Sequence, residues 1–253
     1  ADIVTSASYQ ATVDGFEKKG FSKEEAASLI QSSIALVQDA RDEYLSSHEE
    51  ENRPAPLTAA SVGPYGAYLA DGSEYRGDYG KTREELADFH RERIHILAEA
   101  GPDVFACETI PCLVEALAET DVLSEIPGAE AWISFSCKDG LHTCGGDLIS
   151  DCAKALKDIK EVAAIGINCT APQYVESLIK EIVKVTDKPV VVYPNSGEDY
   201  DAGSKSWEGS AAKYEDYVKI WYEAGARLIG GCCRTGPEDI RKVAAFRKSL
   251  IEK

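Results

Sequence analysis

The residues with the clearest chemical potential are two adjacent cysteines, Cys232 and Cys233, which follow two glycines after a short apolar run. Thiolates bind Zn²⁺ at about 2.3 Å, and three protein ligands with a fourth position open are typical of catalytic zinc sites. Adjacent residues of a regular strand point to opposite faces, but Gly230 and Gly231 permit an irregular backbone that can direct both sulfurs towards one ion. The sequence of these four residues alone is equally compatible with thiols packed in the core or with a vicinal disulfide.

Further polar side chains stand where short apolar runs end. They are Tyr9, Ser61, Glu108, Cys169 and Asn195. In a barrel of parallel strands the reacting groups come from the C-terminal strand ends and the loops that follow them. We therefore expect these side chains to share one face of the fold with the cysteine pair, although spacing alone does not select Cys169 as a third ligand.

An alternation of strand-like and helix-periodic segments predicts the elements that position these residues. The predicted strands span residues 3–8, 57–62, 104–108, 131–137, 162–168, 190–193 and 227–229. The predicted helices span residues 23–44, 83–99, 113–124, 148–159, 174–185, 211–223 and 237–248. Several of the strands are apolar without alternation, which is typical of strands covered on both faces and predicts a parallel sheet.

The succession of strand-helix units predicts an α/β fold of the (β/α)8 TIM-type barrel class. Such a barrel usually needs eight units and about 250 residues, so we expect that the first strand-helix unit is absent from the recorded chain. A doubly wound open sheet is the alternative, but no Gly-x-Gly-x-x-Gly turn follows any predicted strand. No change of composition divides the chain, which predicts a single domain over residues 1–253.

Charge and composition restrict the partners. The formal net charge of −17 argues against general affinity for nucleic acid or anionic membranes, because both repel an acidic surface. No apolar run approaches the roughly 20 residues of a membrane span. The first residues lack the basic start and apolar core of a signal peptide, so we expect a reduced, cytoplasmic setting for the eight cysteines. Small molecules are the expected partners, and the oligomeric state is not predicted.

Five motifs together resemble those of the homocysteine S-methyltransferases. They are SVGPYGAYLADGSEYRGDY from residue 61, CETIP from 107, GINCTAP from 166, VVYPNSGEDYD from 191 and GGCCRT from 230. The resemblance covers essentially the whole chain and implies a zinc-dependent (β/α)8 barrel in which Cys169, Cys232 and Cys233 hold one Zn²⁺ per chain. Members of the family open with a strand that ends in an Asp-Gly-Gly-like turn, and no such segment precedes Ala1.

The resemblance also implies the reaction, in which a sulfonium donor, S-methylmethionine or S-adenosylmethionine, methylates homocysteine to give methionine. A free thiol with a pKa near 8.5 is mostly protonated at neutral pH, whereas a zinc-bound thiol is ionised. Glu108 matches the family's carboxylate for the amino group of homocysteine, and we predict it as the catalytic residue. Ser61 and Asn195 are predicted to bind substrate. Tyr9, with Tyr65 and Tyr68 as further candidates, is predicted to hold the sulfonium by cation–π contact.

Two alternatives stay open at this point. A betaine-dependent homocysteine methyltransferase would share the zinc site and the acceptor, and only the likeness of residues 61–79 favours a sulfonium donor. A non-catalytic zinc-binding or redox-sensing protein would instead pair Cys232 with Cys233 in a disulfide.

Overall fold

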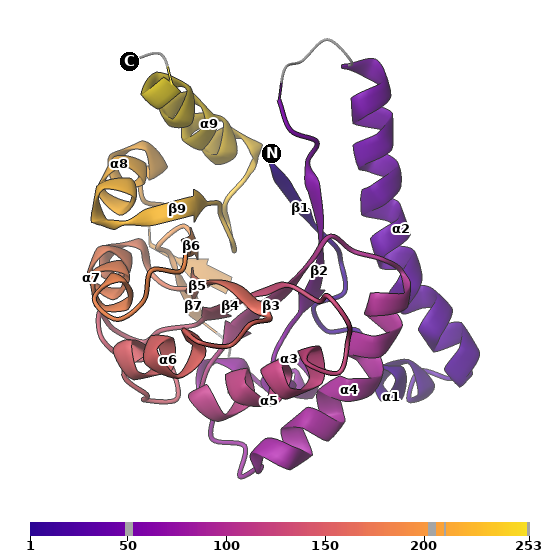
Figure 1. Cartoon of the computed structure of the whole chain (residues 1–253). Helices are drawn as coiled ribbons and strands as arrows, with labels where there is room; N and C mark the ends of the chain where they lie inside the picture. Colours follow the sequence, from indigo (N-terminus) through magenta and orange to yellow (C-terminus); the bar gives the residue numbers. More distant parts are fainter. Residues whose placement is uncertain (49–52, 202–205, 210, 252–253) are drawn as a thin grey trace.

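Seven parallel strands form one curved sheet in the computed structural model, which describes residues 1–48, 53–201, 206–209 and 211–251 (Figure 1). The strands are β1 (Ile3–Thr5), β2 (Leu57–Val62), β3 (Val104–Ile110), β4 (Ala131–Phe135), β5 (Val162–Asn168), β6 (Val190–Tyr193) and β9 (Ala226–Ile229). They pair in this order, each parallel to its neighbour. β5 and β9 are therefore separated by β6 alone.

Helices follow the strands and cover the outer face of the sheet (Figure 1). They are α2 (Lys23–Ser47), α4 (Arg83–Glu99), α5 (Leu113–Leu123), α6 (Ile149–Leu156), α7 (Pro172–Val183), α8 (Tyr214–Ala224) and α9 (Pro237–Ile251). Shorter elements lie in the connections: α1 (Val13–Glu17), α3 (Tyr65–Leu69), the 3-10 turn η1 (Ser73–Tyr75), and an antiparallel pair, β7 (Asp199–Asp201) and β8 (Ser206–Glu208).

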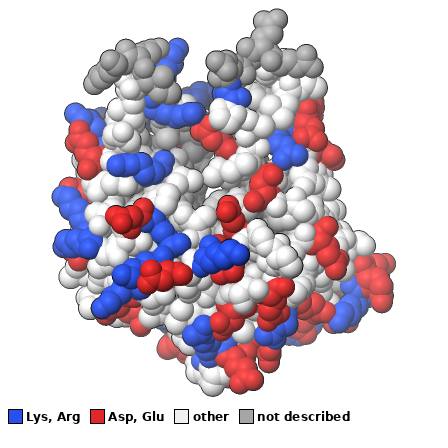
Figure 2. Space-filling view, viewed as in Figure 1, with Lys and Arg blue, Asp and Glu red and all other residues white. Residues whose placement is uncertain are grey.

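The predicted barrel class is confirmed in the form of a curled sheet that is open between β1 and β9 (Figure 1). An ion pair of 3.0 Å between Arg247 of α9 and Asp2 joins the two sides of the opening. Figure 2 shows a hollow between these sides and a surface on which both signs of charge are interspersed. Within the described part of the chain, no helix combines the length and the apolar character that crossing a membrane requires.

Two apolar layers hold the sheet. Successive strand residues point to opposite faces, so one set packs under the helices and the other lines the concave face. The outer layer includes the fully buried Ile133 and Ile165 together with helical leucines and isoleucines. The concave face carries Ala59, Ala106 and Trp132, which form a smaller separate cluster. The alanines leave room for the rings of Trp132 and Tyr193 and for the polar side chains beside them.

Local signals account for the long elements. Ser22 and Thr82 form capping boxes that begin α2 and α4 where they were predicted. The predicted bounds coincide with β2, α4, β5 and β6. The short elements α1, α3, η1 and the β7–β8 pair were not predicted, because three to five residues carry too little periodicity to detect. The charged composition of residues 46–56 predicts a surface loop, and residues 49–52 of this segment lie outside the described residues.

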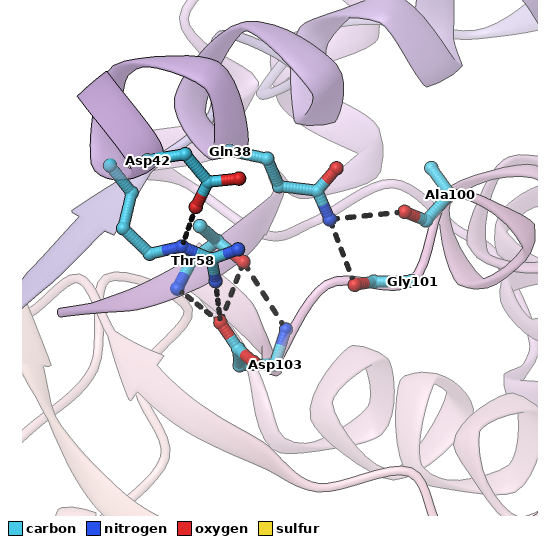
Figure 3. Close-up of polar contacts among 7 residues, drawn as sticks. Gln38, Asp42, Thr58, Ala100, Gly101 and Asp103 are labelled. Carbon is cyan, nitrogen blue, oxygen red and sulfur yellow. Dashed lines mark hydrogen bonds and ion pairs between the residues drawn. The ribbon is translucent and has the colours of Figure 1, made fainter. Parts of the chain in front are cut away.

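A polar network closes the end of the sheet opposite the cysteines (Figure 3). One carboxylate oxygen of Asp103 accepts hydrogen bonds from the backbone N–H and the hydroxyl of Thr58 at 2.7 and 2.8 Å. Arg41 of α2 donates to the same oxygen at 3.1 Å, and Gln38 donates to the carbonyls of residues 100 and 101. These contacts tie α2 to the start of β2 and β3, and in a barrel this end serves stability rather than catalysis.

Candidate metal centre

Three sulfurs meet at the C-terminal end of the sheet. Cys169 follows β5, and Cys232 and Cys233 follow β9. The Sγ atom of Cys169 lies 2.6 Å from that of Cys232 and 3.6 Å from that of Cys233, and the last two are 3.9 Å apart. Among the described residues this is the one group of three metal-binding side chains whose ligand atoms come together. The sequence predicted all three residues, and the structure brings them together.

The backbone at Cys169 is turned out of the strand. Its φ angle is +45°, in the left-handed region that a non-glycine residue adopts at a cost of about 1–3 kcal/mol. The backbone N–H of Cys169 donates to the carbonyl of Tyr193 on β6, and the hydroxyl of Thr170 donates to the carbonyl of Asn168. These contacts hold the turn against its strain and aim the sulfur towards β9.

Gly231 has a steric reason to be glycine. A Cβ atom there would lie 2.3 Å from the hydroxyl oxygen of Thr235, so any side chain would displace the turn. The carbonyl of Cys232 accepts hydrogen bonds from the N–H of Thr235 at 3.2 Å and from its hydroxyl at 2.7 Å, while the Cys232 N–H donates to the carbonyl of Pro194. This turn replaces the regular alternation of a strand and places both neighbouring sulfurs on one side.

The sulfur separations fit a zinc site. Tetrahedral ligands at 2.3 Å from Zn²⁺ lie about 3.8 Å from one another. The separations of 3.6 and 3.9 Å agree with this value, whereas the 2.6 Å between Cys169 and Cys232 would have to widen. All eight cysteines are free thiols, and the Cys232–Cys233 separation is well beyond the roughly 2.05 Å of a disulfide. The cluster therefore suits zinc, and the vicinal disulfide of the redox alternative is absent.

Hydrogen bonds among the three sulfurs shift their pKa values in opposite directions. Hydrogen bonds from Cys169 and Cys232 hold the pKa of Cys233 far below its usual value. Hydrogen bonding to the other two sulfurs, together with burial, raises the pKa of Cys232. The hydrogen bond with Cys232 lowers the pKa of Cys169, but the one with Cys233 and burial outweigh it and leave the pKa raised. Because metals bind thiolates, a divalent cation would displace the remaining thiol protons.

Glu108 lies beside this cluster on the concave face. It accepts a short hydrogen bond from the hydroxyl of Ser61. Burial raises its pKa, and the charge of Cys233 adds to this, while hydrogen bonds from Ser61 and Tyr193 oppose it. The carboxylate is thus costly to keep ionised without a cation, which is the property expected of a group that receives an ammonium.

A buried polar network that the sequence did not predict surrounds Glu108. Asn168 accepts from the N–H of Thr109 at 2.7 Å and from the hydroxyl of Ser134 at 2.9 Å, and donates to the Thr109 hydroxyl at 2.8 Å. Tyr193 accepts from the indole of Trp132 at 2.8 Å. Thr109 has a φ of +64° at a register shift in β3. The network fixes this bulge directly after Glu108. The sequence signal that could have revealed the network is the pairing of Asn168 with Cys169 and of Glu108 with Thr109 at two strand ends.

Two tyrosines lie near the sulfurs. Burial raises the pKa of Tyr9, a hydrogen bond with Thr109 opposes this, and the charge of Cys169 raises it further. Burial raises the pKa of Tyr75 as well, followed by the charges of Cys169 and Cys233. Both phenols are neutral at physiological pH. The sequence predicted Tyr9 but not Tyr75, because the 61–79 stretch contains four tyrosines and no periodicity that selects one.

The remaining predicted side chains have other contacts. The Ser61 side chain is buried and donates to Glu108, so it supports that carboxylate. The Asn195 side chain accepts from the N–H of Gly197 at 2.9 Å and thereby shapes its own turn. Tyr65 and Tyr68 pack on Phe89, and lysine ammonium groups already lie over both rings, at 5.9 and 4.9 Å from the ring centres.

Comparison with known proteins agrees with this geometry. The family described as homocysteine S-methyltransferase matches residues 1–246. The chain is 54% identical over 253 residues to homocysteine S-methyltransferase YbgG of Bacillus subtilis, covering 99% of this chain and 80% of the relative. It is 50% identical over 272 residues to homocysteine S-methyltransferase 2 of Arabidopsis thaliana, covering all of this chain and 80% of the relative.

Solved structures agree as well. The metallated crystal form of the homocysteine methyltransferase MmuM from Escherichia coli is similar with a TM-score of 0.87 at 41% identity, over 97% of this chain and 80% of that chain. The apo form of the same enzyme gives a TM-score of 0.79. With a family match over nearly the whole sequence and close relatives in bacteria and plants, the chain belongs to the homocysteine S-methyltransferase family.

Proposed function

We propose that this chain transfers a methyl group from a sulfonium donor to homocysteine and so produces methionine, with Cys169, Cys232 and Cys233 as the ligands of one Zn²⁺. The observation that carries the proposal is the convergence of three sulfurs from two separate strand ends beside the buried carboxylate of Glu108. Membership of the family supports the acceptor and the product. A reduced cytoplasmic setting would keep such thiols available for the metal.

The three cysteines would hold the ion and leave one of four positions for the sulfur of the substrate. When bound, Zn²⁺ supplies the ionisation of the acceptor thiol at neutral pH. The transferred methyl loses its bond to the sulfonium sulfur, which keeps the electron pair and leaves as a neutral thioether. The new bond forms with a lone pair of the homocysteine sulfur, whose proton is lost when the substrate binds.

Glu108 orients the acceptor. Its carboxylate is the acidic group on the concave face next to the sulfurs, and it is held from behind by the hydroxyls of Ser61 and Tyr193. A hydrogen bond from the substrate ammonium to this buried carboxylate is charge-assisted and fixes the direction from which the thiol approaches. Asn195 forms the turn after β6 and has an amide suited to the amino-acid end of a substrate.

The surroundings of the sulfurs suit a cationic methyl donor. The side chains close enough to interact electrostatically with the three cysteines include the phenols of Tyr9 and Tyr75 and the carboxylate of Glu108. Phenol rings attract a cation through their faces. A quaternary ammonium donor such as betaine would be attracted in the same way, so the choice of a sulfonium rests on the likeness of residues 61–79 to the family.

Metal analysis followed by a three-donor assay tests the proposal. Freshly reduced protein is expected to contain one zinc per chain and to form methionine with S-methylmethionine or S-adenosylmethionine. Cys169→Ser is expected to lose both the zinc and the turnover. Turnover with betaine alone would refute the donor. Metal-free protein that forms a Cys232–Cys233 disulfide under reductant would refute the enzyme and support the redox alternative.

A further inference from the structure

Four ionisable side chains are fully buried outside the metal centre, between α4 and α5. They are His90 and Arg93 on α4 and Glu115 and Glu119 on α5, and none is more than 2% exposed. Charged residues are almost never this buried unless they are paired, and burying them costs free energy that an apolar core would not. Nothing in the methyl-transfer chemistry uses them directly, so their presence calls for another role.

The hydrogen bonds define how the cluster is arranged. The guanidinium of Arg93, which can only donate, lies 2.8 Å from Nδ1 of His90, so Nδ1 accepts. The proton of the neutral imidazole is then on Nε2, which donates to Glu115 at 3.0 Å. Burial lowers the pKa of His90 to about 4, and burial raises the pKa of Glu119 well above its usual value.

Two members of the cluster, Arg93 and Glu115, hold a turn that follows β2. Arg93 donates a short hydrogen bond to the carbonyl of Gly63, and Glu115 accepts from the backbone N–H of Tyr65 at 2.5 Å. Pro64, between them, is the N-cap residue of α3 and makes no side-chain cap of its own. The carboxylate of Glu115 therefore caps α3 from another helix, where an anion is favoured by the orphan N–H groups and the helix dipole.

This turn also supports the phenols of Tyr9 and Tyr75, which lie near the sulfurs. A Cβ atom on Gly63 would lie 2.6 Å from the ring of Tyr9, and the N–H of Gly63 donates to the Tyr9 carbonyl at 3.1 Å. A Cβ atom on Gly66 would lie 2.3 Å from the backbone nitrogen of Glu74, the residue before Tyr75. Both approaches are too close to admit even a methyl group, so a displacement of the turn would move both tyrosines.

We propose that Arg93 and Glu115 are positioning residues for methyl transfer: they clamp residues 63–65 and thereby hold Tyr9 and Tyr75 against the thiol cluster. The inference rests on the proposed function, because it assigns these phenols to the donor side of the site. A buried ion pair between two helices could be replaced by apolar side chains, but apolar side chains cannot pair a backbone carbonyl and a backbone N–H on either side of a proline.

The test compares Arg93→Met with a matched variant of the same helix, Leu97→Ala, which removes buried apolar volume without touching the turn. Both variants are expected to lose thermal stability and to keep one zinc per chain. Arg93→Met is expected to raise the donor KM and lower kcat/KM by about tenfold or more, because small displacements of a positioned group are costly. Leu97→Ala is expected to leave both constants close to wild type.

A readout independent of turnover is the ¹⁹F NMR signal of 3-fluorotyrosine placed at position 9 alone. Arg93→Met is expected to shift or broaden this signal, Arg93→Lys to do so less, and Leu97→Ala to leave it unchanged. Glu115→Gln keeps the size and an acceptor for the Tyr65 N–H, so it provides a second, milder variant if Arg93→Met does not fold, with a smaller shift in the same direction.

The kinetic constants and the ¹⁹F signal distinguish a failure of the positioning role of Arg93 and Glu115 from a failure of the proposed reaction. A wild-type chain without turnover would refute the proposed function, and the ¹⁹F signals would still decide whether the clamp positions Tyr9. Unchanged signals and an unchanged donor KM in folded Arg93→Met or Glu115→Gln protein would overturn the inference. Equal changes in Leu97→Ala would do the same, since they would show that general loss of packing moves the site.

Discussion

Replacing Glu108 by Gln isolates the charge of the buried carboxylate. Glutamine has the same shape and retains an acceptor for the hydroxyl of Ser61, so the local packing is preserved. The variant loses the charge-assisted hydrogen bond to the ammonium of homocysteine. A hydrogen bond to a charged group contributes about 1.5–3 kcal/mol, which corresponds to an increase of roughly 10- to 150-fold in the homocysteine KM.

The same variant has a defined effect on stability. Burial raises the pKa of Glu108, so the folded state prefers the protonated form. The contribution of this group to stability is therefore fully present below its unfolded-state pKa and is lost as the pH rises through the raised folded-state pKa. Glu108→Gln removes that loss. We expect its Tm to equal or exceed that of the wild type at pH 7.5, and the difference to shrink towards pH 4.

Steady-state methionine formation at saturating donor, together with thermal unfolding, measures both effects. 4-Mercaptobutanoate, which is homocysteine without the amino group, is the decisive comparison: the wild type should prefer homocysteine, and Glu108→Gln should have largely lost the preference. Glu125→Gln, on the surface beside Arg91, serves as the control. An unchanged preference for homocysteine in Glu108→Gln, with zinc retained, would refute the role of the carboxylate.

Two further predictions concern the frame of the site. Gly231→Ala would place a methyl group 2.3 Å from the Thr235 hydroxyl, so the zinc content should fall below one per chain. Gly236→Ala is the control, because its methyl group meets nothing within 4 Å and the zinc should be retained. Equal zinc contents in the two variants would contradict the prediction. Asp103→Asn should cost about 1 kcal/mol of stability at pH 7, since the carboxylate is partly exposed. Burial alone would raise the pKa of Asp103, but hydrogen bonds from Thr58 lower it, so the stabilising effect of the carboxylate is lost when it is protonated. Urea unfolding should therefore show that the stability difference between Asp103→Asn and the wild type closes below about pH 4. A difference that persists at that pH would contradict this role of the carboxylate.

The long elements could be predicted because their signals are local. The capping boxes at Ser22 and Thr82, and the apolar runs of β5 and β6, are fixed by residues within a few positions of one another. The short helix α3 could not be predicted in this way, since its cap comes from Glu115, fifty residues further along the chain. Its start is decided by how α5 packs.

The residue types and their order along the chain indicated the barrel class and the family, and the resemblance to that family implied the three thiols as ligands. What only the tertiary structure decided is which groups meet: the left-handed turn at Cys169, the turn that Gly231 permits beside Thr235, and the pairing of β5, β6 and β9 bring sulfurs more than sixty residues apart to within 4 Å. The physical reason is that alternation and capping depend on neighbouring residues, whereas the place of Tyr75 and the buried Arg93–Glu115 clamp depend on which helices and strands pack against each other.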